Sequence, residues 1–204
     1  MNHHIDPPCL STITDQAHKN NTGFCRHYMF LYSVVLGLEA KNVLEFGSGF
    51  STTCMLQALR LTGGKLTTIE QRSIEEQHLW FNEQTLSDHS GLWSYVQGDS
   101  LSTVPSIDHS PYDLVLHDGS HTGSVVVIDI NNILPHIKTG GFLLLHDTAH
   151  PDLGGEMTHA INSSNLRSMD HEIVTLPYGY GLTLIRLLES KTKEQVNLTW
   201  RKIS

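Results

Sequence analysis

Short β-rich runs alternate with helix-like segments from Val43 to Leu187, and this alternation limits the fold more than any other feature. It predicts a parallel sheet covered by helices, because a crossover between parallel strands needs about a dozen residues and is usually a helix. The predicted strands are Asn42–Phe46, Lys65–Glu70, Trp93–Gln97, Tyr112–His117, Gly141–His146, Glu172–Leu176 and Leu182–Leu187. The predicted helices are Arg26–Leu38, Ser51–Leu61, Ser73–Ser87, Thr122–Ile137 and Glu156–Ser168.

The connection between the last two predicted strands consists only of Pro177–Gly181. It is too short for a helical crossover, so these two strands must pair antiparallel. We therefore expect an α/β fold of the doubly wound type. Its seven-stranded sheet is predicted to be mostly parallel, with an antiparallel last strand.

Length and composition predict one soluble domain. The 204 residues are expected to form a single unit, with 1–40 as an N-terminal arm and helix, 41–187 as the core sheet and 188–204 as a tail. A formal charge of −8 without a basic stripe argues against nucleic acid as a partner. Three cysteines without CxxC spacing argue against a disulfide framework or structural zinc. No secretory signal is visible and no apolar run approaches the roughly 20 residues that span a bilayer, which predicts a cytoplasmic protein with no membrane partner.

A loop with two glycines follows the first predicted strand. Gly47 and Gly49 let the backbone turn sharply and pass close to a ligand, with Ser48 between them and Ser51 at the start of the next helix. The loop lacks the third glycine of G-x-G-x-x-G, so it suits a pyrophosphate less well. A tight turn without a ligand is the alternative.

Acidic residues end the next two predicted strands. Glu70, followed by Gln71, lies about 20 residues beyond the glycine loop, where a carboxylate can accept hydrogen bonds from both hydroxyls of a ribose. The alternative is a solvated surface glutamate. Asp99 can accept from an adenine amino group, or it can cap the helical turn that begins near Ser100.

The fourth and fifth predicted strands both end in Leu-His-Asp, at residues 116–118 and 145–147. Neighbouring strands lie about 4.8 Å apart, so if these two are adjacent, Asp118 and Asp147 meet where open α/β sheets bind ligands. Carboxylates that close repel unless a proton or a divalent cation lies between them. We expect a hard divalent cation there, and the alternative is that each aspartate caps the following helix.

These motifs, in this order and spacing, resemble those of the class I S-adenosylmethionine-dependent methyltransferases. The resemblance is strongest to small-molecule O-methyltransferases related to catechol O-methyltransferase and to macrolide- and sugar-methylating enzymes, and it covers roughly residues 41–187. It implies S-adenosyl-L-methionine as the cofactor. The implied cofactor-binding residues are Glu45, Gly47, Ser48, Gly49 and Ser51 around its methionine part, Glu70 and Gln71 at the ribose, Asp99 and Ser100 near the adenine, and Asp118.

The resemblance also implies metal ligands and a catalytic base. Asp118 and Asp147 match metal-binding aspartates, but Thr148 stands where catechol O-methyltransferase has an asparagine ligand and is a poorer one. His121 stands where that enzyme has a lysine base, and an imidazole can accept a proton near neutral pH. We therefore expect Mg²⁺ or another divalent cation at Asp118, Asp147 and Thr148, with Asp118 and His121 as catalytic residues. His146 is the reserve base, because on its strand we expect it to point away from Asp147.

The function implied by this resemblance is methyl transfer to a hydroxyl of a small-molecule acceptor. Two other classes stay open. An NAD-dependent oxidoreductase shares the glycine loop and the acid after the second strand, but the closing hairpin and the paired aspartates argue against it. A non-catalytic cofactor-binding protein would keep the fold, yet it would have no chemical need for His121 and the acids. The acceptor and the oligomeric state, with a homodimer as the candidate, are left open.

Overall fold

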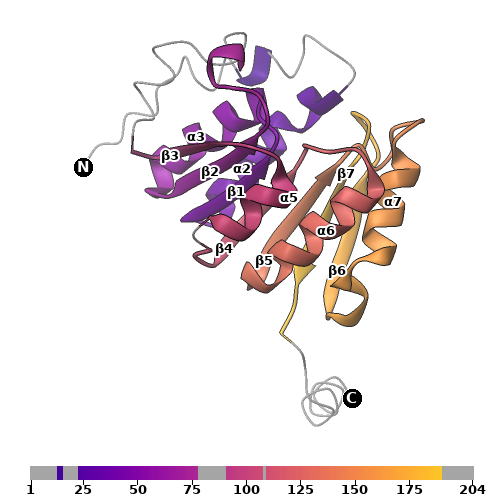
Figure 1. The fold of residues 1–204 in the computed structure, drawn as a ribbon. Coiled ribbons are helices and arrows are strands. Elements are labelled where there is room, and N and C mark those ends of the chain that lie inside the picture. The colour runs from indigo at the N-terminus through magenta and orange to yellow at the C-terminus, as the bar shows by residue number, and fades with distance from the viewer. Residues whose placement is uncertain (1–12, 16–22, 78–90, 108, 190–204) are drawn as a thin grey trace, which may run out of the picture.

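The computed structural model describes residues 13–15, 23–77, 91–107 and 109–189. Strands and helices alternate along this part of the chain (Figure 1). The strands are β1 (Asn42–Phe46), β2 (Lys65–Glu70), β3 (Trp93–Gln97), β4 (Tyr112–His117), β5 (Ile137–His146), β6 (His171–Leu176) and β7 (Leu182–Leu187). The α-helices are α2 (Tyr28–Gly37), α3 (Phe50–Thr62), α5 (Ser100–Thr103), α6 (Gly123–Ile133) and α7 (Gly154–Ser163). Short 3₁₀ helices are η1 (Gly23–His27), η2 (Glu75–Gln77), η3 (Val104–Ser106), η4 (Leu134–His136) and η5 (Asn165–Ser168).

The strands form one seven-stranded sheet in the order β3-β2-β1-β4-β5-β7-β6. Strands β1 to β5 pair parallel with one another, whereas β7 is antiparallel to both β5 and β6. The predicted fold class is therefore confirmed, including the antiparallel last strand. The short hairpin inserts β7 beside β5 and leaves β6 at the edge of the sheet.

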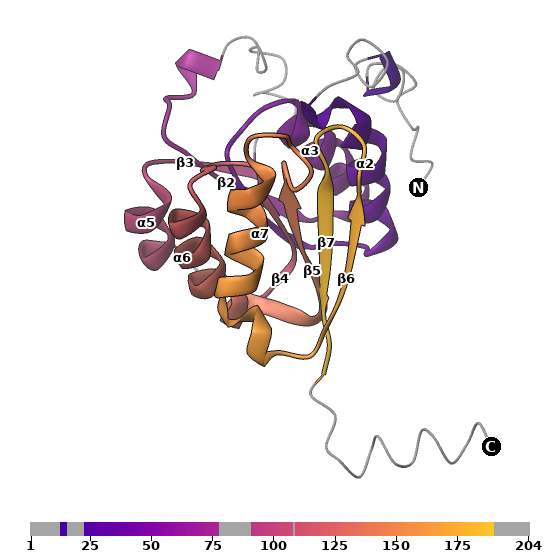
Figure 2. The same ribbon diagram turned by 90° about the vertical axis from the view of Figure 1, so that its right-hand side faces the viewer.

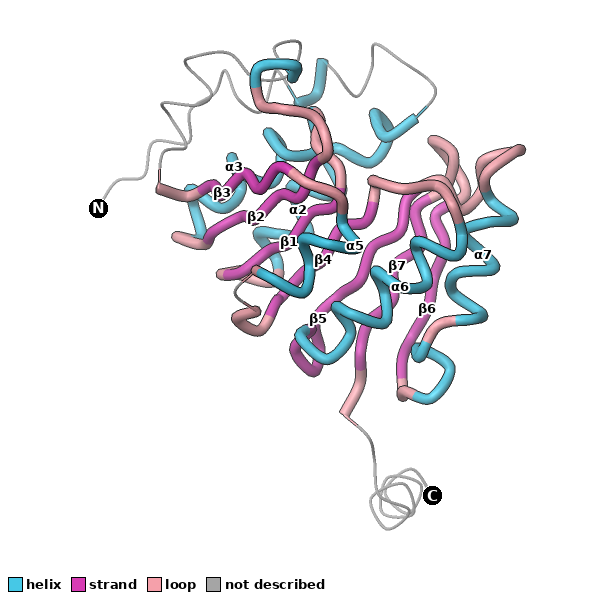
Figure 3. The backbone as a smooth tube through the Cα atoms, in the orientation of Figure 1, coloured by secondary structure: helices cyan, strands magenta, loops and turns pink. Residues whose placement is uncertain are grey.

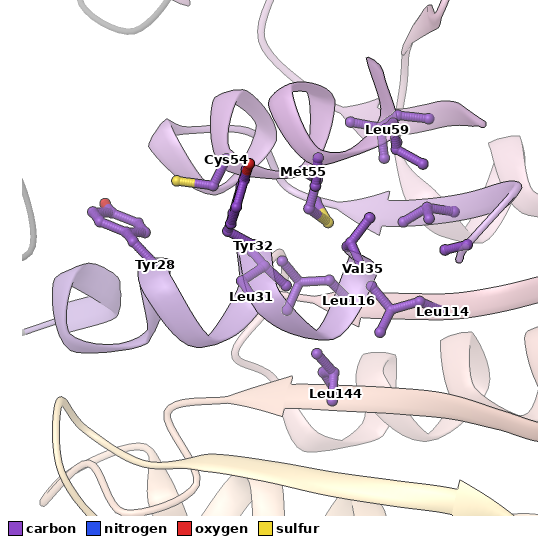
Figure 4. Packing of buried hydrophobic residues seen from close by; sticks show 14 of the residues in the cluster. Tyr28, Leu31, Tyr32, Val35, Cys54, Met55, Leu59, Leu114, Leu116 and Leu144 are labelled. Carbon is purple, nitrogen blue, oxygen red and sulfur yellow. The ribbon is translucent and has the colours of Figure 1, made fainter. Parts of the chain in front are cut away.

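Helices cover both faces of the sheet, as the predicted alternation requires. Helices α2 and α3 lie on one face and α5, α6 and α7 on the other (Figure 2), with the strands side by side between them (Figure 3). Side chains of a strand alternate between the faces, so Leu114 and Leu116 of β4 pack under α2 and α3 while Val115 packs under α6 and α7. Figure 4 shows Val35 and Leu59 meeting this first face. None of the helices in the described ranges is long and apolar enough to cross a membrane.

Two predicted helices end differently in the structure because local chemistry stops them. The predicted helix Thr122–Ile137 ends at Ile133, since Pro135 follows in η4 and Ile137 already pairs with Tyr112 as the start of β5. This makes β5 longer than the predicted Gly141–His146. The predicted helix Glu156–Ser168 is α7, which begins at Gly154 and ends at Ser163 before η5.

The other predicted helices are confirmed to different extents. The first predicted helix is split into η1 and α2, whereas α3 matches its prediction to within one residue at each end. Of the predicted helix Ser73–Ser87, the structure describes only the short turn η2, and residues 78–87 lie outside the described residues. Strand β6 begins one residue earlier than predicted, at His171.

Candidate active site

A cavity of about 540 Å³ opens at the carboxyl ends of β1 to β4, where open α/β sheets bind their ligands. Seven of the predicted cofactor-binding residues line it, and three do not. Those that line it are Gly47, Ser48, Glu70, Gln71, Asp99, Ser100 and Asp118. His121, the predicted base, lines the same cavity. The structure thus brings most of the predicted ligand-binding residues and the predicted base together.

Gly47 is required by the protein's own packing. Its φ is 82°, and a Cβ built there would lie 2.3 Å from the carbonyl oxygen of Asp118. Gly49 lies off the cavity's lining, and a Cβ there would meet no protein atom within 4 Å. Gly47 therefore lets the loop after β1 lie against the end of β4, which is a different reason from the close ligand approach that the sequence suggested.

The side chains of Glu45 and Ser51 turn away from the cavity, which corrects their predicted place around the ligand. The Glu45 carboxylate is fully buried and accepts hydrogen bonds from Ser51 Oγ at 2.7 Å, Thr52 Oγ1 at 2.7 Å and Thr68 Oγ1 at 2.9 Å. Burial raises the pKa of Glu45 to about 8, although the three hydroxyls oppose the rise. This buried cluster ties β1 to β2 and to the start of α3, and so positions the loop.

Glu70 lies on the cavity wall as a carboxylate with several donors. It accepts from the Ser48 amide at 3.0 Å, from Ser48 Oγ at 3.1 Å and from Arg72, whose Nε and Nη2 each lie 3.1 Å from a different carboxylate oxygen. Burial favours the neutral acid, but these hydrogen bonds and the Arg72 charge outweigh it and lower the pKa of Glu70. The group therefore stays ionised and can accept from ligand hydroxyls, which would compete with Arg72 for the same oxygens.

Asp99 acts as a helix cap, the alternative that the sequence left open. Its Oδ1 accepts from the Leu101 amide at 2.9 Å at the start of α5, and its Oδ2 accepts from Gln71 Nε2 at 3.0 Å. The second bond holds Gln71 at the cavity wall. Asp99 still lines the cavity, so capping does not remove it from the site.

Sequence reasoning missed Asp129. This residue of α6 is fully buried, and its Oδ2 accepts from Ser100 Oγ at 3.0 Å and lies 3.1 Å from His117 Nε2. Through these two contacts, Asp129 anchors α6 to the start of α5 and to the end of β4. The available signal was an acid within the apolar run of residues 125–130, because charged residues are seldom buried without a partner.

The register of β4 and β5 decides how the two Leu-His-Asp ends meet. His117 pairs with Leu145, so continuing by one residue places His146 opposite Asp118. His146 is 5% exposed, and its Nδ1 lies 3.0 Å from Asp118 Oδ1 and 3.3 Å from Asp147 Oδ1. The expectation that His146 points away is therefore wrong, because the offset register puts its ring between the two carboxylates.

His121 reaches the same cluster from the loop after β4. Its Nε2 lies 2.6 Å from Asp147 Oδ2, and this hydrogen bond raises the pKa of His121 despite partial burial. Burial also opposes ionisation of Asp147, but the hydrogen bonds from His121 and His146 outweigh it and hold the pKa of Asp147 far below its usual range. Asp147 has a φ of 58°, a conformation that costs a non-glycine residue about 1–3 kcal/mol and is common at functional sites.

The structure brings only two of the three predicted cation ligands together, Asp118 and Asp147. The hydroxyl of Thr148, the predicted third ligand, accepts from Thr183 Oγ1 at 2.9 Å, and Thr183 is itself bonded to Thr175 at 2.7 Å. Oδ1 of Asp118 and Oδ1 of Asp147 both face Nδ1 of His146. One oxygen or nitrogen of each of Asp118, His121 and Asp147 lies within 4.8 Å of the others, so a cation there would use His121 in place of Thr148.

Solved structures share this fold. The O-methyltransferase TomG from Streptomyces achromogenes, solved in complex with SAM, is 19% identical with a TM-score of 0.64, and the match covers 89% of this chain and 90% of TomG. The methyltransferase PaMTH1 from Podospora anserina, solved with SAH bound, is 15% identical with a TM-score of 0.63, and the match covers 90% of this chain and 97% of PaMTH1.

Sequence comparison gives the family. The O-methyltransferase ankF from Aspergillus thermomutatus is 24% identical over 174 residues, which are 73% of this chain and 72% of that protein. A family model described as a methyltransferase domain matches residues 44–148, about half of the chain, from β1 to the end of β5. This protein therefore belongs to that family of methyltransferase domains.

Proposed function

We propose that this protein transfers a methyl group from S-adenosylmethionine to a hydroxyl of a small molecule. The observation that carries the proposal is one cavity with the ionised Glu70 on one wall and with Asp118 and His121 on another. Behind these two, Asp147 completes a cluster with them. The first wall suits a ribose and the second a group that must lose a proton. The names of the relatives support it, since both ankF and TomG are O-methyltransferases and TomG was solved with SAM.

The cavity suits a ligand of the cofactor's size and polarity. Its volume of about 540 Å³ falls within the usual range of about 300–1,000 Å³ for small-molecule sites. The residues that would hold the cofactor are Ser48 beside the glycine loop, Glu70 and Gln71 at the ribose, Asp99 and Ser100 near the adenine, and Asp118. When bound, the cofactor supplies a methyl group that its sulfonium already activates.

His121 is the proposed base. Its Nε2 faces the ionised Asp147, which can only accept, so Nε2 carries the hydrogen and Nδ1 keeps the lone pair that takes the proton of the acceptor hydroxyl. Asp147 then stabilises the imidazolium that forms, as a carboxylate does for a catalytic histidine. The raised pKa of His121 means that this base becomes available only as the pH rises through that value.

Calorimetric titration of the full chain with S-adenosylhomocysteine and, separately, with NAD tests the proposal. We expect S-adenosylhomocysteine to bind and NAD not to bind. Glu70→Ala removes a charged hydrogen-bond acceptor and should weaken binding by about 1.5–3 kcal/mol. Glu172→Ala, which removes an exposed acid at the edge strand β6, is the matched control and should leave affinity unchanged.

Two results would contradict the proposal. Binding of NAD in place of S-adenosylhomocysteine would favour the oxidoreductase alternative. Unchanged affinity in Glu70→Ala would remove Glu70 from the ribose site. A radiolabelled methyl-transfer assay against a panel of hydroxylated small molecules then identifies the acceptor class.

A further inference from the structure

Both ring nitrogens of His146 face hydrogen-bond acceptors. Nε2 lies 3.1 Å from the carbonyl oxygen of Gly179, and a carbonyl can only accept, so Nε2 carries a hydrogen. Nδ1 faces the carboxylate oxygens of Asp118 and Asp147, which also accept when ionised. An imidazole that donates from both nitrogens is the positively charged form.

The surroundings of His146 explain how a charge can persist there. From η1, the rings of Phe24 and His27 cover it, with centroids 4.6 and 5.8 Å from its own, and the hairpin contributes the backbone of Gly179. Burial and His146 itself lower the pKa of His27 to about 4, so His27 stays neutral. Burial disfavours a charge on His146, and the carboxylate oxygens of Asp118 and Asp147, at 3.0 and 3.3 Å from its Nδ1, offset that cost.

We propose that the His146 imidazolium takes the place of a divalent cation between Asp118 and Asp147. This inference concerns how the proposed methyl-transfer site is held together, so its importance for activity rests on the proposed function. Two carboxylates that lie close together need a proton or a cation between them, and the offset register of β4 and β5 supplies an imidazole at that point. His146 is thus a positioning residue and not the reserve base.

The consequence of this arrangement is a fixed base. His146 holds one oxygen of Asp147 while His121 bonds the other, at 3.3 and 2.6 Å. The contact with His146 thus helps hold Asp147 in its left-handed conformation, and Asp147 in turn orients the ring of His121. The hydrogen bonds and charge of His146 also favour the ionised form of Asp147 without a metal.

Metal binding gives the sharpest test, since it needs neither cofactor nor acceptor. Titration calorimetry of the full chain with MgCl₂ and MnCl₂ should show no saturable site in the wild type at millimolar concentrations. His146→Ala removes the positive charge between the carboxylates and should bind Mn²⁺ roughly tenfold tighter than the wild type or better. Adding Asp147→Asn to that variant should abolish the gained site. His171→Ala, at the opposite end of the sheet on β6, should behave as the wild type.

Nitrogen-detected NMR of the wild-type protein with labelled histidine keeps the proposal testable if His146→Ala does not fold. At about pH 8.5, two units above the ordinary pKa of histidine, one ring should still carry hydrogens on both nitrogens. The proposal is overturned if every histidine ring is neutral at that pH. It is equally overturned if the wild type holds stoichiometric metal or binds Mn²⁺ with His146 intact. Failure to bind S-adenosylhomocysteine would instead contradict the proposed function and leave this charge assignment standing.

Discussion

At the scale of single residues, the site depends on which atom of each side chain is left for a substrate. His121 Nε2 is held by Asp147, so only Nδ1 can accept a proton, and His146 has neither nitrogen available. The same logic places Glu45 outside the cavity, because three hydroxyls already use its oxygens. Two residues of the same type, such as His121 and His146, therefore have different roles because different atoms of their side chains are already hydrogen-bonded.

His121→Ala should lower turnover roughly 10²–10⁴-fold, because it removes the proposed general base. The affinity for S-adenosylhomocysteine, measured by calorimetry, should stay close to that of the wild type. In the wild type the rate should fall as the pH falls through the raised pKa of His121, and this limb of the pH profile should disappear in the variant. Near-normal turnover across the pH range in His121→Ala would show that the proton leaves by another route.

At the scale of elements, the site is built from the loops that follow β1 and β4 and from the end of β5. Gly47 lies directly against the backbone of Asp118, so the loop after β1 sets the position of the loop that carries His121. Phe46 extends this contact, since its ring stacks on His117 at 4.9 Å. The glycine loop after β1 and the loop that carries His121 are consequently one packed unit.

Gly47→Ala tests that packing, with Gly49→Ala as its matched control. At Gly47 an added Cβ meets a carbonyl oxygen and the φ is positive, so we expect a loss of about 1–3 kcal/mol or more in the free energy of unfolding. At Gly49 the backbone is extended and the space is open, so the loss should be smaller. Urea denaturation of both variants measures the difference, and equal losses would show that Gly47 does not couple the two loops.

At the scale of the whole molecule, buried histidines make stability depend on pH in both directions. The pKa of His146 is raised to about 10, so its contribution is fully present below the unfolded pKa of about 6.5 and is lost as the pH rises through 10. The pKa of His27 is lowered to about 4, so the unfolded chain binds more protons between about 6.5 and 4, and stability is lost as the pH falls through that window.

We therefore expect His146 to lower the free energy of unfolding as the pH rises above about 6.5, and His27 to lower it as the pH falls below that value. Glu45, whose pKa is raised to about 8, adds to the alkaline fall. The alkaline fall, measured by urea denaturation between pH 7 and 10, should be clearly smaller in His146→Ala than in the wild type. His171→Ala, which removes a histidine near the start of β6, should keep the wild-type profile. An alkaline limb of equal size in His146→Ala would show that another group causes it.

Single-domain organisation, a cytoplasmic location and a homodimer stay predictions. In the edge strand β6, the side chains of Ile173 and Val174 are more than half exposed. An exposed edge strand can pair with a second chain, and this is a reason to test for a dimer. Size-exclusion chromatography with light scattering measures the oligomeric state directly.

Local chemistry made the strands and the fold class predictable from sequence. Five of the seven strands begin and end as predicted, because β-rich runs bounded by turn residues carry their own signal. The hairpin Pro177–Gly181 needed only a length argument to fix the antiparallel pairing. The ends of α6 and α7 were harder, since apolar periodicity continues past the point where Pro135 and the following strand take over.

What only the tertiary structure decided is the meeting of residues from different strands. The sequence placed an acid pair at the ends of β4 and β5 and called for a proton or a cation between them. The register of these strands depends on packing across the whole sheet, and an offset of one residue changes which side chain faces which. That offset puts His146 between Asp118 and Asp147, and the same long-range packing buries Glu45. Residue types and their order are local, whereas the pairing of distant strands is not.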